Sequence, residues 1–145
     1  MGVSGVTRQT LYRHWPVRSA LLTDMILAGA AGGYPEPGED PAAVVSAWLT
    51  SLRDALDDQA RRAAVLAVTA QADTDPDSAK ALARLTADRL GALNELLKPS
   101  GVQLAPDEYA LLSGPLLARI FFERAEATDA FIASVVTQWL AGRRG

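Results

Sequence analysis

The amino-acid sequence predicts an all-α protein, and three observations support that fold class. Alanine and leucine, both strong helix formers, dominate the chain. No stretch alternates apolar and polar residues for long enough to form a half-buried strand. Proline and glycine occur in small groups that separate the helical segments from one another. Hydrophobic residues make up 49% of the 145 residues and charged residues 21%, a balance that is typical of a folded globular chain.

The first two predicted helices lie at the N-terminus, over residues 7–15 and 17–30. Thr7 is suited to cap the first of them because its hydroxyl oxygen can accept a hydrogen bond from a backbone N–H of the first turn. Pro16 ends that helix, since proline disfavours helical backbone at the residue before it. Apolar residues recur at helical spacing through the second helix, so we expect it to bury one face.

A linker follows this pair of helices. Residues 32–38 contain three glycines and two prolines, a composition that interrupts helical structure. The linker divides the chain into an N-terminal domain of residues 1–31, which we expect to be a partial DNA-binding domain, and a larger helical-bundle domain of residues 40–145.

The remaining helices are predicted mainly from the signals at which they start. Two Asp-Pro pairs, Asp40-Pro41 and Asp75-Pro76, combine an N-cap residue with a proline in the first turn. Acidic residues after Pro106 favour a third start of this kind. The predicted helices of this domain cover residues 41–57, 59–72, 76–97, 106–125 and 129–141.

The last two predicted helices carry apolar residues on two faces rather than one. On the first, one row contains Leu112 and Leu116, and another contains Leu111 and Phe122. A surface helix needs one apolar face, so we expect a second subunit to cover the other in a two-fold homodimer with a four-helix interface. An alternative is that the second face marks a central core helix. The expected interface residues are Leu112, Leu116, Ile120, Phe131, Val135 and Trp139.

The N-terminal tip has the pattern of the second half of a helix-turn-helix. Gly5 allows a tight turn, and the helix that starts at Thr7 presents polar and basic side chains first. Residues 1–18 carry three arginines and no acidic side chain, so this tip suits a polyanion. Arg8 can bond to guanine and Gln9 to adenine in a major groove. The expected DNA-contacting residues are Thr7, Arg8, Gln9, Thr10, Tyr12, His14 and Arg18.

Three short runs of the tip agree in type and spacing with a known family. They are Gly5-Val6-Thr7, Leu11-Tyr12-Arg13-His14-Trp15 and Arg18-Ser19-Ala20-Leu21-Leu22. Together they closely resemble the recognition helix of the TetR family of bacterial transcriptional regulators, and Leu112-Ser113-Gly114-Pro115-Leu116 with Arg119 resembles its C-terminal region more loosely. The resemblance implies a one-component regulator, a repressor in particular, that binds operator DNA as a dimer. A small, largely apolar effector would bind in the C-terminal domain.

The chain departs from that family at its start. Members carry two complete helices before the Gly-Val turn, whereas only residues 1–4 precede it here, and two helices of average length need roughly 25 residues. We therefore expect a truncation within the helix-turn-helix and only weak, mainly electrostatic DNA binding by this form. Operator binding is expected if the missing helices are present. The alternative is a ligand-binding or dimerisation module without DNA-binding activity.

An effector pocket is expected between the middle helices of the larger domain, because gaps between bundle helices are a usual place for small molecules. Plain core packing is the alternative for each lining residue. The expected lining residues are Trp48, Leu52, Leu66, Thr69, Leu82 and Leu117.

Several classes of protein are disfavoured by residue types. The chain has no cysteine and a single histidine, which excludes thiol chemistry and paired-histidine metal sites. The alternating acids of Asp73-Thr74-Asp75-Pro76-Asp77 lack the later glycine and glutamate of a calcium loop, so we expect them to cap a helix.

No nucleophile, base and orienting group can be assembled, so we expect neither an enzyme nor a cofactor or metal. Without a signal peptide or an apolar span, we expect a cytoplasmic protein that is not bound to a membrane.

Overall fold

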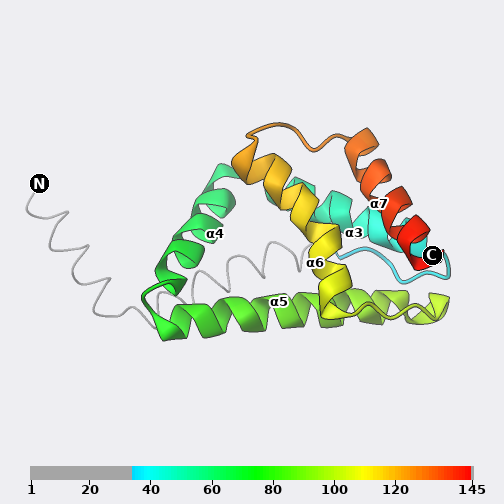
Figure 1. Ribbon diagram of the computed structural model, residues 1–145, viewed down its shortest axis with the longest axis horizontal. Helices are drawn as coiled ribbons and strands as arrows, with labels where there is room; N and C mark the ends of the chain where they lie inside the picture. The colour runs from blue at the N-terminus through cyan, green and yellow to red at the C-terminus, as the bar shows by residue number, and fades with distance from the viewer. Residues whose placement is uncertain (1–33, 145) are drawn as a thin grey trace, which may run out of the picture.

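The computed structural model describes residues 34–144, and every regular element in that range is helical (Figure 1). The expected all-α fold class is confirmed for this part of the chain. The two helices expected over residues 7–15 and 17–30 lie outside the described residues. The elements are α3 (Pro41–Ala55), α4 (Gln59–Ala72), α5 (Pro76–Leu97), the 3₁₀ turn η1 (Lys98–Ser100), α6 (Pro106–Leu117), the π-helical turn η2 (Ala118–Phe122) and α7 (Asp129–Arg144).

Aspartate caps begin the first three of these helices. Asp40, Asp58 and Asp75 each accept a hydrogen bond from the backbone N–H two residues ahead, over 3.1, 2.9 and 3.2 Å. These bonds satisfy donors that the helix itself leaves unpaired at its N-terminus. The Asp75 carboxylate also accepts a hydrogen bond from the Ser78 hydroxyl over 2.9 Å. The expected capping role of this acidic segment is thus confirmed at Asp75.

The end of α6 differs from the prediction. A single helix was expected over residues 106–125, but regular α-helix ends at Leu117 and a π-helical turn follows. Pro115 lies inside the helix and has no N–H, so it cannot donate the usual bond to the preceding turn. The chain leaves the turn through a backbone bond from Glu123 N to Ala118 O of 3.0 Å, which spans five residues.

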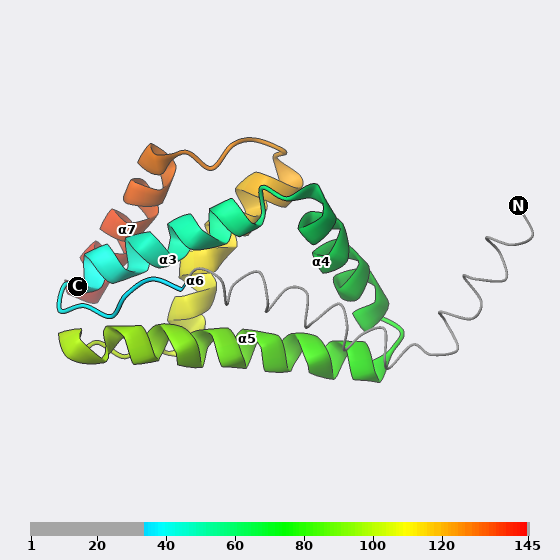
Figure 2. The ribbon, with the colours of Figure 1, turned by 180° about the vertical axis from the view of Figure 1, so that it is seen from behind.

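The helices enclose one apolar core. In Figures 1 and 2, α5 runs along one edge, α4 leads from the end of α3 to the start of α5, and α7 lies beside α3. Contacts between α3 and each of α5, α6 and α7 make α3 the central element. Most of the deeply buried large side chains come from these four helices, and they are Val45, Trp48, Leu49, Leu93, Leu97, Leu112, Leu116 and Ile132; Val68 of α4 is buried to the same degree.

Candidate functional site

An open groove runs between α6 and α7 on the surface of the domain. Its volume is about 790 Å³, and apolar side chains of both helices line most of its length. Leu111, on the rim of this groove, is 74% exposed, and Phe122, at the end of η2, is 87% exposed. Large apolar side chains that gather in this way on a surface commonly mark a site of interaction. The apolar lining residues are Leu111, Leu112, Pro115, Phe131, Val135 and Trp139.

The structure corrects two of the expected interface residues. Leu112 and Leu116 are each 1% exposed and belong to the chain's own core. Although Leu112 borders the groove, neither residue has appreciable surface for a second subunit to cover. The outward row of α6 is instead the one that contains Leu111 and Pro115, and Phe122, beyond the helix, is exposed as well. Both rows are apolar, and α3 packs on the Leu112 side. Sequence periodicity alone cannot tell which of the two rows faces the core.

The other four expected interface residues are half-buried. Phe131, Val135 and Trp139 follow one another at four-residue spacing along α7 and line the groove together. Ile120 lies in η2 and packs against the edge of the core. All four retain some surface, and their place in a dimer interface stays a prediction.

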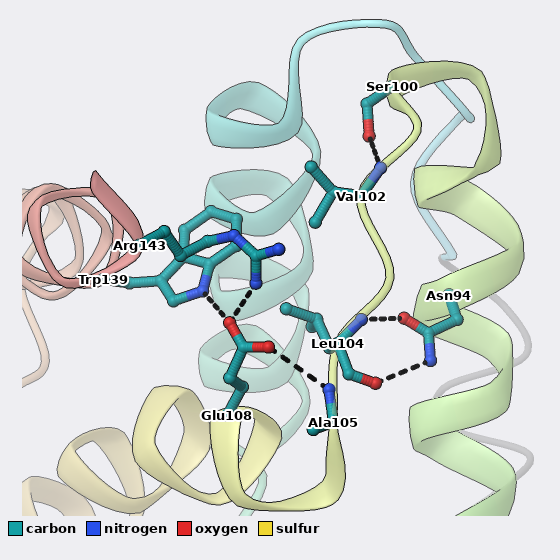
Figure 3. A network of polar contacts seen from close by, with 8 residues as sticks. All are labelled: Asn94, Ser100, Val102, Leu104, Ala105, Glu108, Trp139 and Arg143. Atoms are coloured by element: carbon teal, nitrogen blue, oxygen red, sulfur yellow. Dashed lines mark hydrogen bonds and ion pairs between the residues drawn. The ribbon is translucent and has the colours of Figure 1, made fainter. Parts of the chain in front are cut away.

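A carboxylate holds the two helices together at one end of the groove (Figure 3). Glu108 Oε2 accepts hydrogen bonds from Trp139 Nε1, over 3.2 Å, and from the Arg143 guanidinium. Glu108 Oε1 accepts a third from Ala105 N over 3.3 Å. Partial burial favours the neutral carboxyl, but the hydrogen bonds from Arg143, Trp139 and Ala105 outweigh that effect and keep the pKa of Glu108 below its ordinary value.

Side chains from α5 and from the turn that follows it hold the segment before α6 in place. Asn94 donates from Nδ2 to Leu104 O over 3.2 Å and accepts at Oδ1 from Leu104 N over 2.8 Å, so it pairs both backbone groups of one buried residue (Figure 3). Ser100 Oγ accepts from Val102 N over 3.2 Å. Gly101 has a φ of 77°, a conformation that L side chains rarely adopt. These contacts fix where α6 starts and hence where Glu108 lies.

A second cavity lies between the α3–α4 turn and the segment before α7. Its volume is about 740 Å³, and its lining is largely charged. Arg53 donates to Asp129 Oδ1 over 2.5 Å and to Ala127 O over 3.2 Å across it. The bond to Asp129 is the main reason that the pKa of Arg53 is raised. Both arginines and carboxylates line this cavity, so it has no single charge to attract a ligand.

The six residues expected to line an effector pocket are distributed over four helices. Trp48 and Leu52 lie on α3, Leu66 and Thr69 on α4, Leu82 on α5, and Leu117 on α6. Trp48 is 1% exposed in the core, whereas Leu66 is 42% exposed. None of the six lines either of the two cavities described above. A pocket formed by these side chains stays a prediction.

Tyr34 and Arg89 lie beside Trp48, and the sequence predicts neither contact. The Tyr34 ring stacks on the indole with 5.3 Å between ring centroids and 8° between planes. The Arg89 guanidinium carbon lies 5.0 Å from the Trp48 ring centroid. An aromatic residue inside a linker rich in glycine and proline is a weak sequence signal for such a contact. Nothing in the spacing along the chain connects Arg89 to Trp48, because they meet only through the packing of α5 on α3.

The seven residues expected to contact DNA lie outside the described residues. Within residues 34–144, no three histidine or acidic side chains gather where they could hold a metal ion. No helix in that range is long and apolar enough to cross a membrane.

Comparisons of the chain with protein families, with curated proteins and with solved structures found no match.

Proposed function

We propose that this protein is a homodimeric, ligand-responsive transcriptional regulator organised like those of the TetR family, and that it acts as a repressor. The observation that carries the proposal is the outward apolar face of α6, η2 and α7. The N-terminal run from Gly5 to Leu22, with its recognition-helix pattern, supports the DNA-binding part. The described helical domain is the part to which dimerisation and effector binding are assigned.

The apolar face suits a second copy of the chain because it offers both a ridge and a groove. Leu111 on α6 and Phe122 at the end of η2 are 74% and 87% exposed, and Leu111 lines the groove of about 790 Å³. Burying one such side chain contributes about 1.5–3 kcal/mol. In a two-fold arrangement each ridge covers the other subunit's apolar face, so every contact occurs twice.

Dimerisation is also what the proposed DNA recognition requires. A two-fold dimer presents two copies of the predicted recognition helix to half-sites about one DNA turn apart. Two arrangements of the dimer are expected, which differ in the spacing of the two recognition helices. An effector that binds them with different affinity shifts the population from one to the other and releases the operator. The predicted ligand is a small, largely apolar molecule.

The dimer is tested by sedimentation equilibrium of the full chain and of Phe122→Glu. The wild type is expected at twice the chain mass of 15.4 kDa, and the variant at the mass of one chain, because a charge at this position has to be desolvated in the interface. Ala83→Glu, which puts the same charge on an exposed position of α5, is the control and should remain dimeric. A wild type of single-chain mass at high micromolar concentration would refute the dimer.

DNA binding is tested by selecting sequences from random duplexes and measuring their affinity at two salt concentrations. Specific binding should be lost in Arg8→Ala and Gln9→Ala, since both side chains are proposed to contact base edges. The competing proposal is a ligand-binding or dimerisation module without DNA-binding activity. All 17 acidic side chains lie in the body of the chain, outside residues 1–18, and this favours the module in one respect, because an acidic body repels DNA. A stable dimer that shows no salt-dependent binding to duplex DNA, and still selects no sequence when two helices are added before Gly5, would favour the module over the regulator.

A further inference from the structure

Trp48 has a polar group that the fold leaves unpaired. The side chain is 1% exposed, and its buried Nε1–H has no hydrogen-bond acceptor among residues 34–144. Buried N–H groups almost always have a partner, because an unpaired donor in the interior has lost its hydration without compensation. An unpaired donor in the middle of a core helix therefore needs an explanation, and a bound acceptor is one.

The residue that covers the Trp48 ring is itself only loosely enclosed. Tyr34 stacks on the indole in near-parallel geometry, 5.3 Å between centroids, yet it is 41% exposed. It lies in the irregular stretch 34–40, which reaches the body of the domain through a backbone bond from Gly38 N to Leu96 O of 3.3 Å. A ligand ring could take the place of the Tyr34 ring without disturbing a helix.

A cation also lies against the Trp48 ring. The Arg89 guanidinium carbon is 5.0 Å from the Trp48 ring centroid, and the side chain is half-buried. Within residues 34–144, no carboxylate forms an ion pair with Arg89. A half-buried guanidinium over the indole ring attracts an anionic ligand more strongly than an exposed one does, because water screens it less.

We propose that Trp48, Arg89 and Tyr34 form a binding site for an aromatic carboxylic acid whose carboxylate sits on a short flexible arm. The ligand ring replaces that of Tyr34 on the face of Trp48. The arm carries the carboxylate around the edge of the indole, where it accepts the Nε1–H bond and lies near the Arg89 charge. The inference deepens the proposed function, since it names the effector class, and it rests on that function only for the effect on DNA.

The site also connects a ligand to the linker. Tyr34 belongs to the stretch that joins residues 1–31 to α3, so a ligand that displaces its ring changes the contact between linker and body. Bound and free states then differ in a contact next to the N-terminal domain. Such a differential contact is what an effector needs in order to shift an equilibrium.

The inference is tested with 1-naphthylacetate as the probe, by calorimetry and by ¹H–¹⁵N spectra of the full chain without DNA. Saturable binding is expected, together with a downfield shift of the Trp48 indole N–H, which Trp48→Phe assigns. Cyclohexylacetate, which cannot stack, and 1-naphthaleneethanol, which has no charge, should each bind at least tenfold more weakly.

Variants locate the probe. Arg89→Gln should weaken binding of 1-naphthylacetate at least tenfold, whereas Arg84→Gln, an exposed arginine on the same helix, should leave the affinity within twofold. Tyr34→Ala should tighten binding about threefold or more, since the ring that competes for the site is gone. Equal binding by Arg89→Gln, or no binding up to millimolar probe by wild type and Tyr34→Ala, would overturn the inference. These measurements contain no DNA, so their outcome does not depend on operator binding. A chain that binds the probe but not DNA would leave this site standing and count only against the proposed function.

Discussion

Glu108 and Trp139 are 31 residues apart in sequence and are joined by a hydrogen bond of 3.2 Å from the indole Nε1 to the carboxylate. The bond links the first turn of α6 to the last turns of α7, and Arg143 donates to the same oxygen. The carboxylate thereby satisfies the indole N–H at the end of the groove proposed to receive a second subunit. It ties the geometry of that groove to one side chain.

Replacing Glu108 with glutamine should destabilise the fold. The substitution keeps the shape of the side chain but removes the charge that strengthens its bonds to Arg143 and Trp139, so a loss of about 1–2 kcal/mol is expected. Urea denaturation of both proteins measures it. Glu39→Gln, at an exposed position before α3, provides the control and should change stability by less than about 0.5 kcal/mol.

The contribution of Glu108 should depend on pH in a defined direction. Its pKa in the folded chain lies below the ordinary value of 4.5, so its contribution is complete above that value and is lost as pH falls through the lower folded pKa. The stability difference between wild type and Glu108→Gln should be constant near neutral pH and shrink below about pH 4.5. A difference that grows on acidification would show that the charged carboxylate is not the stabilising form.

Asn94→Ala should be more disruptive than its half-buried position suggests. The amide of Asn94 pairs both the N–H and the C=O of Leu104, which is 3% exposed. Its removal leaves two buried backbone groups unpaired, at a cost of about 2–3 kcal/mol. Thermal unfolding monitored by circular dichroism measures the change. Gln103→Ala, one residue before Leu104 and exposed, should leave the transition almost unchanged.

Two glycines should respond to alanine with opposite signs. Gly91 is exposed within α5 and a Cβ there meets nothing within 4 Å, so Gly91→Ala should stabilise the fold by about 0.5–1 kcal/mol. Gly101 has equal space but a φ of 77°, and Gly101→Ala should destabilise the fold by about 1–2 kcal/mol. Chemical denaturation of the two variants side by side checks both signs, and like effects would contradict the conformational argument.

Pro115→Ala should alter assembly more than stability. The alanine restores a backbone donor, so α6 should continue straight and lose the π-helical turn that directs Phe122 outward. We expect the dimer to weaken at least tenfold, about 1.4 kcal/mol, which analytical ultracentrifugation can measure. If the variant dimerises as tightly as the wild type, the kink plays no part in the proposed interface.

Local signals in the sequence predicted much of the described fold. The Asp-Pro pairs placed the starts of α3 and α5, and α4 covers the expected residues 59–72. Caps act over two or three residues, so the information that sets them is present in the sequence itself. The end of α6 was less predictable, because the effect of Pro115 depends on how the next turn can re-pair its backbone.

Only the tertiary structure decided which apolar row became core. The rows of Leu111 and Leu112 are both apolar, and the position of α3 buried Leu112 and left Leu111 74% exposed. The meeting of Tyr34 and Arg89 at Trp48 likewise depends on the packing of α5 and the linker on α3. By itself the sequence determined helical content, helix starts and the amount of apolar surface, because these follow from neighbours along the chain. The direction each face points depends on residues far apart in sequence, so the packing of the whole domain settled it.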